Sequence, residues 1–260
     1  MLSRRLLLAA APALGLAGAA LASERGAYPP DVGRKFRADG RVMPFRGNTI
    51  IHHLPQQGPG SEFFDALLNI YRELPAQAFS RKITALPPSS YHMTLFGGAN
   101  DSDRRPGLWP AGLPLDLPMA ECDRILGERL KAFDLDCELP FRMRVDLAEP
   151  PPAERPLTIR LVPLDAAEDA KLRRLRSRLS DVLGIRAPGQ DAYRFHVTLA
   201  YLYRWLTPEE DRAFRAALAG WRDRLAKACP VIELGAPEYC LLEDMFAFKR
   251  QFYLGRPSIL

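Results

Sequence analysis

The chain carries the same short tract twice. Residues 91–95 read YHMTL and residues 195–199 read FHVTL, so the two histidines, His92 and His196, lie 104 positions apart. Polar and apolar residues alternate in each tract, which predicts a β-strand with one buried face. Residues two apart on a strand share a face, so the histidine and threonine of each tract point together, and the apolar residues point into a core. The chain has only four histidines, and half of them stand in this repeated setting.

Each tract also stands inside the same order of predicted elements. Apolar residues at three- and four-residue spacings predict helices, and short runs rich in branched residues predict strands. The first half gives a strand at 48–51, a helix at 61–74, the tract strand, an insertion at 96–118, a helix at 119–133 and a strand at 141–146. The second half gives a strand at 157–162, a helix at 166–183, the tract strand, a helix at 208–228 and a strand at 231–234. A last apolar segment at 245–254 predicts a hairpin or an edge strand.

The repeated order predicts an α+β fold with duplicated β-α-β-α-β lobes. We expect a single bilobal domain over residues 46–254, with lobes at about 46–150 and 155–254, each a sheet covered by helices. The tract strands would meet at a central groove between the two sheets. This arrangement would bring His92 and His196 into one site, with two imidazoles and two hydroxyls available for proton transfer around an oxyanion.

The first residues have the pattern of an export signal. Arg4 and Arg5 precede an apolar run that ends in a small-residue cleavage signature at 20–22, and paired arginines are typical of the twin-arginine route. We therefore expect a signal peptide at 1–22, an N-terminal extension at 23–45, and a periplasmic protein that leaves the membrane after cleavage. An uncleaved anchor is the alternative, although the apolar run of ~16 residues is short for a membrane span.

Charge and cysteine content narrow the function further. Removal of residues 1–22 takes away two arginines and no acids, so the formal net charge falls from +5 to +3. This mild excess suits an anionic substrate and falls short of a surface that coats nucleic acid. An oxidising compartment would favour disulfides among Cys122, Cys137, Cys229 and Cys240. Four cysteines allow three pairings, and the Cys229–Cys240 bridge would close the shortest loop.

The paired His-x-Thr tracts, each on a predicted strand in one half of a duplicated α+β chain, resemble those of the two-histidine (2H) phosphoesterase superfamily. Residues 47–49, 88–94 and 192–199 also look like an uncharacterised, largely bacterial branch of it, and the resemblance covers about 47–254. It implies an RNA ligase/cyclic phosphodiesterase-like fold. It also implies a phosphodiesterase without metal or other cofactor, acting on 2′,3′-cyclic phosphates or short 2′-linked nucleotides. His92 and His196 would be its catalytic base and acid, in an order that the sequence leaves open.

Other residues on the same strand face as the two histidines extend the predicted site. Thr94 and Thr198 share a face with the histidines, and we predict that their hydroxyls donate to phosphate oxygens, although threonine is also a common structural residue in strands. Ser90 and Arg194 each stand two residues before a tract histidine. Both are therefore predicted to reach the phosphate, provided that the strands begin early enough.

Other polar residues near the predicted strands have weaker signals. Tyr193 is predicted to stack on a base of the substrate, and Asn48, at the start of the first strand, is predicted to reach the substrate. His52 and His53 are adjacent, so at most one of them can face the groove. Their position just before Pro55 favours a loop.

The other functions that we considered differ in what the protein would bind: nucleic acid, a metal ion or a phosphorylated ligand. The basic run at 171–178 accompanies a leucine stripe, so its charges are predicted to form a solvated helix face, and no stable nucleic-acid complex is expected. A metal-dependent hydrolase with both tract histidines as ligands is an alternative, but no third and fourth ligand falls at a helpful spacing. A catalytically idle module that binds phosphorylated ligands is another. We expect a small phosphodiester or nucleotide as substrate, and the oligomeric state stays open.

Overall fold

The computed structural model describes residues 26–148 and 156–255, so the predicted signal peptide at 1–22 lies outside the described residues. The helices are α2 (Glu62–Glu73), α3 (Met119–Lys131), α4 (Ala166–Leu183) and α5 (Pro208–Ala228). The strands are β1 (Gly47–His53), β2 (Ile83–Ala85), β3 (His92–Asn100), β4 (Phe141–Val145), β5 (Leu157–Pro163), β6 (His196–Leu202), β7 (Ile232–Leu234), β8 (Glu238–Leu242) and β9 (Phe248–Tyr253). Short 3₁₀ turns lie at Leu74–Ala76, Ser80–Lys82, Pro88–Ser90 and Gln190–Ala192.

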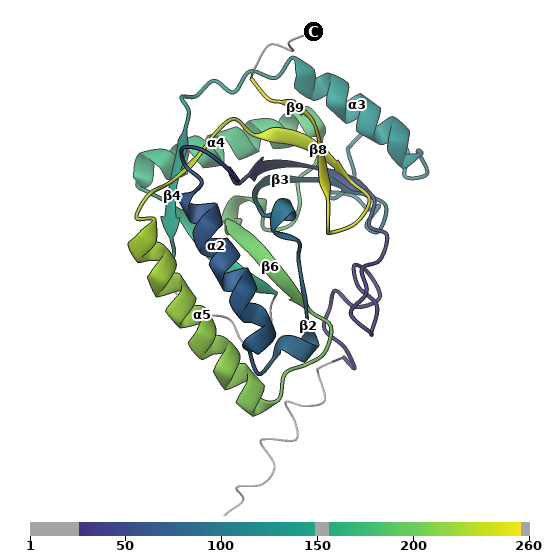
Figure 1. The fold of residues 1–260 in the computed structure, drawn as a ribbon. Helices are drawn as coiled ribbons and strands as arrows, with labels where there is room; N and C mark the ends of the chain where they lie inside the picture. Colours follow the sequence, from purple (N-terminus) through teal and green to yellow (C-terminus); the bar gives the residue numbers. More distant parts are fainter. Residues whose placement is uncertain (1–25, 149–155, 256–260) are drawn as a thin grey trace, which may run out of the picture.

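The strands form one curled antiparallel sheet in the order β7-β4-β5-β6-β3-β1-β8-β9, with β2 added beside β6. Helix α2 packs against α5, and α3 packs against α4. Figure 1 shows α2 and α5 side by side in one part of the molecule, with α3 near the β8–β9 hairpin. The predicted α+β class is therefore confirmed.

The two halves of the sequence meet at β3 and β6, where Met93 pairs with Val197. They also exchange strands. Strand β4 from the first half pairs with β5 and β7, whereas β8 from the second half pairs with β1 and carries β9. We expected a groove between two sheets. The structure instead has one continuous sheet, and the predicted groove corresponds to one face of it, around the contact between β3 and β6.

The helices follow the periodicity of the sequence. Helices α4 and α5 have the predicted bounds, and the leucine stripe of α4 is buried. The side chain of Thr207 accepts from the backbone N–H of Glu210, and the backbone N–H of Thr207 donates to the Glu210 carboxylate, which completes a capping box at the start of α5. The edge strand expected within 245–254 is β9, whereas β8 was not predicted.

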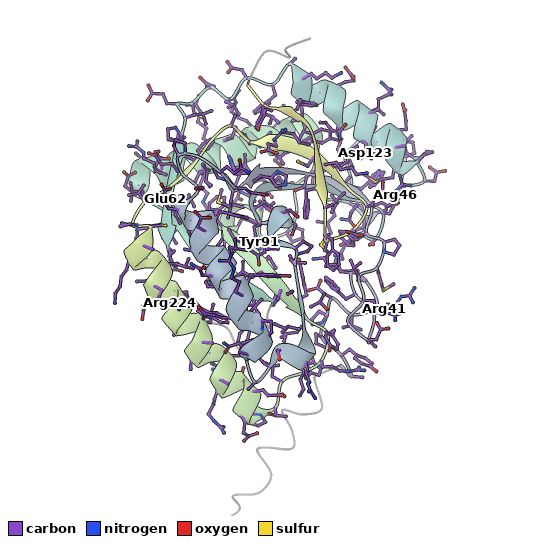
Figure 2. All side chains as sticks on the ribbon, viewed as in Figure 1. Arg41, Arg46, Glu62, Tyr91, Asp123 and Arg224 are labelled. Atoms are coloured by element: carbon purple, nitrogen blue, oxygen red, sulfur yellow. The ribbon has the colours of Figure 1, made fainter. Side chains whose placement is uncertain are left out.

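The apolar residues of both tracts lie in the core, as their alternation predicts. The buried set comprises Tyr91, Met93, Leu95, Phe195, Val197 and Leu199. The Tyr91 ring packs against Phe64 of α2, with ring centroids 6.4 Å apart, near the centre of the molecule (Figure 2). Because successive strand residues alternate in direction, the histidine and threonine of each tract face the side of the sheet opposite to this core.

The described part of the N-terminal extension is packed onto the fold. The Phe36 side chain is completely buried and lies against Tyr201 of β6, with ring centroids 4.9 Å apart. The Thr84 hydroxyl of β2 donates to the Gly40 carbonyl at 2.7 Å. Residues 26–46, which we call the N-terminal segment, are therefore part of the folded domain.

All four cysteines are free thiols, so the short Cys229–Cys240 bridge is not formed. Cys229 follows the end of α5. Burial raises the pKa of its thiol, and the nearby Glu62 carboxylate raises it further. Cys240 lies inside β8, with its sulfur 3.9 Å from the Glu238 carboxylate. Among the described residues, no helix has both the length and the apolar character needed to cross a membrane.

Candidate active site

The pairing of β3 with β6 brings the two His-x-Thr tracts together. Met93 stands opposite Val197 in antiparallel register. Because the strands are antiparallel, the residue before Met93 faces the residue after Val197, so His92 falls opposite Thr198. By the same register, Thr94 falls opposite His196. Directly opposed residues of an antiparallel pair have Cβ atoms roughly 4.5–5.5 Å apart. The four side chains that the sequence predicted as one site therefore form a compact group on one face of the sheet.

Both tract histidines are oriented by the same backbone contact. The His92 Nδ1 lies 2.7 Å from the Ser90 carbonyl oxygen, and the His196 Nδ1 lies 2.8 Å from the Arg194 carbonyl oxygen. A carbonyl can only accept, so in each ring Nδ1 carries the proton. Each Nε2 is then left to accept a proton when the ring is neutral or to donate one when the ring is charged.

His92 lies in the more enclosed half of the group. Its ring packs against Phe248 of β9, with centroids 4.2 Å apart, and the centroid of the His53 ring lies 6.3 Å away. Burial lowers the pKa of His92 from 6.5 to about 4, helped by positive charge on His53 and His196 and opposed by the Ser90 carbonyl and the Glu238 carboxylate. His92 is therefore neutral at pH 7.

His196 lines an open cavity of about 670 Å³ together with Thr198. On β6, a bulge follows Thr198, because consecutive residues of β5 pair with Thr198 and with Ala200. A bulge shifts the alternation of side chains by one residue, which explains how Tyr201 lines the same cavity. Volumes of this size are typical of small-molecule sites.

Tyr193 is fixed beside the tracts by helix α4. The Arg176 guanidinium lies 4.0 Å from the centroid of the Tyr193 ring, and Arg173 donates to the Tyr193 carbonyl at 2.8 Å. The Tyr193 hydroxyl also shares a hydrogen bond with the Thr94 side chain. Arg176 is buried and donates to backbone carbonyls on β3 and in the turn before β6. The prediction that the whole basic run of α4 is a solvated face is thus wrong at Arg176.

Two predicted ligand contacts are not supported by the structure. Ser90 belongs to a 3₁₀ turn before β3, where strand parity does not apply, and its buried hydroxyl donates to the Pro87 carbonyl at 2.7 Å. Asn48 is also buried: its amide donates to Asp123 of α3 at 2.8 Å, and its carbonyl oxygen accepts from the Ala99 N–H. Both residues support the strands instead of facing the cavity. Arg194, by contrast, is exposed and lines the cavity beside His196.

Sequence reasoning missed several residues around the tracts. His52 and His53 were predicted in a loop, but β1 extends through both, and His53 pairs directly with His92. Arg160 of β5 pairs with His196. Arg34 and Lys35 of the N-terminal segment also line the cavity. If the predicted first strand had been extended from residue 48 through residue 53, the alternation of side-chain directions would have predicted the face of the sheet on which His53 lies. The N-terminal segment has no such periodic signal.

One group of potential metal ligands occurs within residues 26–148 and 156–255. Ligand atoms of His53, Glu238 and Cys240 lie within 4.8 Å of one another. The His53 Nδ1 lies 2.7 Å from the Glu238 carboxylate, and an Arg250 guanidinium nitrogen lies 3.6 Å from the same carboxylate oxygen. Burial also raises the pKa of the Cys240 thiol. A neighbouring guanidinium and a protonated thiol fit a bound cation poorly, and the group includes neither tract histidine.

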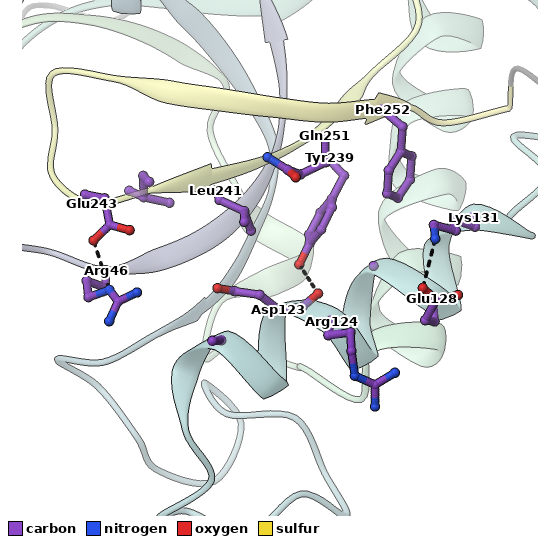
Figure 3. A pocket seen from close by; sticks show the side chains of 13 residues that line it. Arg46, Asp123, Arg124, Glu128, Lys131, Tyr239, Leu241, Glu243, Gln251 and Phe252 are labelled. Atoms are coloured by element: carbon purple, nitrogen blue, oxygen red, sulfur yellow. Dashed lines mark hydrogen bonds and ion pairs between the residues drawn. The ribbon is translucent and has the colours of Figure 1, made fainter. Parts of the chain in front are cut away.

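A second cavity, of about 440 Å³, lies between α3 and the β8–β9 hairpin (Figure 3). The Tyr239 and Phe252 rings line it, and at its edges Arg46 pairs with Glu243 at 2.9 Å and Lys131 pairs with Glu128 at 2.8 Å. These charges are matched within the protein, and no residue of the His-x-Thr tracts lines this cavity. The site defined by the tracts therefore remains the candidate for chemistry.

A curled antiparallel sheet that presents one His-x-Thr tract on each of two adjoining strands defines a two-histidine class of protein. A family profile named 2H-phosphodiest, described as a domain of unknown function (DUF1868), matches residues 35–153. The chain is also similar to the conserved protein of unknown function ATU0111 from Agrobacterium tumefaciens str. C58, with 30% identity, a TM-score of 0.79 and coverage of 90% of this chain and 96% of that one. The chain belongs to the 2H phosphoesterase family.

The protein TT0787 of Thermus thermophilus is 17% identical with a TM-score of 0.42, over 83% of this chain and all of that chain (100%). No significant match is found among curated proteins.

Proposed function

We propose that the protein is a metal-independent phosphodiesterase that hydrolyses a 2′,3′-cyclic nucleotide or a short 2′-linked nucleotide. The observation that carries this proposal is the arrangement of two imidazoles, each with its Nδ1–H bound to a backbone carbonyl, beside two threonines on one face of the sheet. In an in-line displacement at phosphorus, the attacking and leaving oxygens lie on opposite sides, so one imidazole can take a proton from the first while the other gives a proton to the second. Family membership supports the same chemistry.

The different surroundings of the histidines suggest their roles. His92, which is neutral because burial lowers its pKa to about 4, would accept a proton at Nε2 from the attacking water. The water oxygen forms the new bond to phosphorus as the bond to the ribose oxygen breaks. His196, in the open cavity, would donate its Nε2 proton to that ribose oxygen. The Thr94 and Thr198 hydroxyls would donate to the non-bridging oxygens, where negative charge increases in the transition state.

The test is a phosphodiester panel assayed with purified protein, with and without a chelator. We expect turnover of 2′,3′-cyclic nucleotides or 2′-5′-linked dinucleotides, unchanged by the chelator. His92→Ala and His196→Ala should each lower kcat by about 10²–10⁴, and the double variant should be little worse than either single one, because the two groups act as a unit.

His52→Gln is the matched histidine control. His52 is buried and bonded to the Gly235 carbonyl, so its loss should leave turnover at pH 7 intact. Full activity in either alanine variant would refute the two-histidine mechanism. Loss of activity with chelator would favour the metal-dependent alternative. Product binding without turnover of any member of the panel would favour the idle binding module.

A further inference from the structure

The cavity beside His196 is larger than a single phosphate requires. Its volume is about 670 Å³, which lies within the range of pockets that enclose whole small molecules. His196 and Thr198 contribute one part of its wall. The remainder includes the N-terminal segment and the loop before β6, so the cavity has room for more of the substrate than the reacting group.

Basic side chains outnumber acidic ones around this cavity. Arg34, Lys35, Arg160 and Arg194 line it, and among the residues that the structure describes Asp31 is the one acid beside them. These four come from three separated parts of the chain: the N-terminal segment, β5 and the loop before β6. Positive charges that converge on one hollow concentrate the field there and attract anions. The lining therefore fits a ligand with more negative charge than one phosphodiester.

The N-terminal segment holds its cations in place. The Lys35 ammonium lies 3.3 Å from the Tyr201 hydroxyl, 4.8 Å from the centroid of that ring, and 3.3 Å from the Asp31 carboxylate. Its side chain is only 16% exposed. Arg34 also pairs with Asp31, at 3.2 Å. Groups that are already ordered lose little conformational freedom when a ligand binds. Arg34 and Lys35 are therefore preorganised to bind an anion.

We propose that the cavity binds a second phosphate of the substrate and that Arg34 and Lys35 select for it. The inference rests on the proposed function, because the first phosphate is the diester at the two His-x-Thr tracts. A ribonucleotide with a 2′,3′-cyclic phosphate and a 5′-phosphate belongs to this substrate class. Guanidinium and ammonium groups form charge-assisted hydrogen bonds to phosphate, which are stronger than those between neutral groups.

The test compares kcat/KM for adenosine 2′,3′-cyclic phosphate with and without a 5′-phosphate. The wild-type protein should prefer the 5′-phosphorylated substrate by about 10- to 100-fold, the range for hydrogen bonds to charged groups. Lys35→Met, which keeps the apolar stem over Tyr201, should reduce this preference about tenfold, and so should Arg34→Gln. Arg41→Gln is the matched control, because Arg41 belongs to the same segment but its side chain is 79% exposed (Figure 2); it should retain the wild-type preference.

Equal kcat/KM on the two substrates would overturn the proposal, as would a preference that survives both cavity substitutions. If neither substrate is turned over, the second-phosphate site is judged by binding, and the proposed function fails only when the rest of the phosphodiester panel is inactive as well. Calorimetric titration would then compare adenosine 2′,5′-bisphosphate with adenosine 2′-monophosphate. Binding of the bisphosphate that is about tenfold tighter, and that loses this advantage in Lys35→Met, supports the site. Equal affinities refute it.

Discussion

His52 should make the stability of the protein fall between pH 7 and pH 5. Its ring is 2% exposed, lies edge-on to Phe141 with centroids 5.3 Å apart, and places Nδ1 3.0 Å from the Gly235 carbonyl. The Nε2 atom is buried and has no hydrogen-bond partner. A charged imidazole would need an acceptor there as well. Burial therefore lowers the pKa of His52 from 6.5 to about 4, against smaller opposing effects of the Gly235 carbonyl and the Glu238 carboxylate.

The size and sign of the effect follow from proton linkage. Between pH 6.5 and pH 4 the unfolded chain binds a proton at this position and the folded chain does not, so acid favours unfolding. The full gap in pKa corresponds to about 3 kcal/mol. From pH 7 to pH 5, the expected loss in the free energy of unfolding is about 2 kcal/mol for His52 alone.

Urea unfolding at pH 5, 6 and 7 would measure this loss in the wild-type protein and in His52→Gln. Glutamine does not titrate, and its amide can still donate to the Gly235 carbonyl. The variant should lose about 2 kcal/mol less than the wild-type protein across this range, whatever its stability at pH 7. Arg41→Gln, which removes an exposed charge, should follow the wild-type curve. Parallel curves for the wild-type protein and His52→Gln would refute the reasoning.

Two further predictions concern the site. If His92 is the base, the acid limb of kcat/KM should lie near pH 4, because burial lowers its pKa to about 4; a limb at pH 6–6.5 in assays of folded protein would contradict this role. Arg176→Met should lower the free energy of unfolding by about 2–3 kcal/mol, because buried carbonyls on β3 and before β6 lose a charged donor. Arg174→Met on the same helix, where the side chain is 68% exposed, should change it by less than about 0.5 kcal/mol in urea unfolding; equal losses would contradict the role of Arg176.

Local periodicity was enough to predict much of the fold. Helices α4 and α5 have the expected limits because their apolar stripes and the Thr207 capping box are encoded within a few residues. Alternation in the two tracts correctly divided buried residues such as Met93 from the histidines and threonines. These predictions depend on near neighbours in the sequence, and that information is present in a single chain.

Predictions that depended on distant pairing were less accurate. Ser90 shares the parity of His92 in the sequence, but the strand begins only at His92, after a 3₁₀ turn. The exchange of β4 and β8 between the two halves has no local signature, because it is decided by which sheet edges are free to pair. Arg176 stands four residues after Leu172 and three before Leu179, so its spacing is that of the buried stripe, and only its charge suggested a surface position. The carbonyls that accept from it lie on β3 and in the loop before β6, far from α4 in the sequence.

The same exchange explains why two nearly identical tracts need not act identically. Strand β8 pairs with β1 and brings β9 with it, so that Phe248 of β9 covers His92. His196 is bordered instead by β5 and the N-terminal segment, which leave an open, basic cavity. Burial therefore lowers the pKa of one imidazole, while the other faces an open cavity lined by basic side chains. In the proposed mechanism, the repeated tract would supply two proton-transfer groups, and the unrepeated segments around it would supply the difference that an acid and a base require.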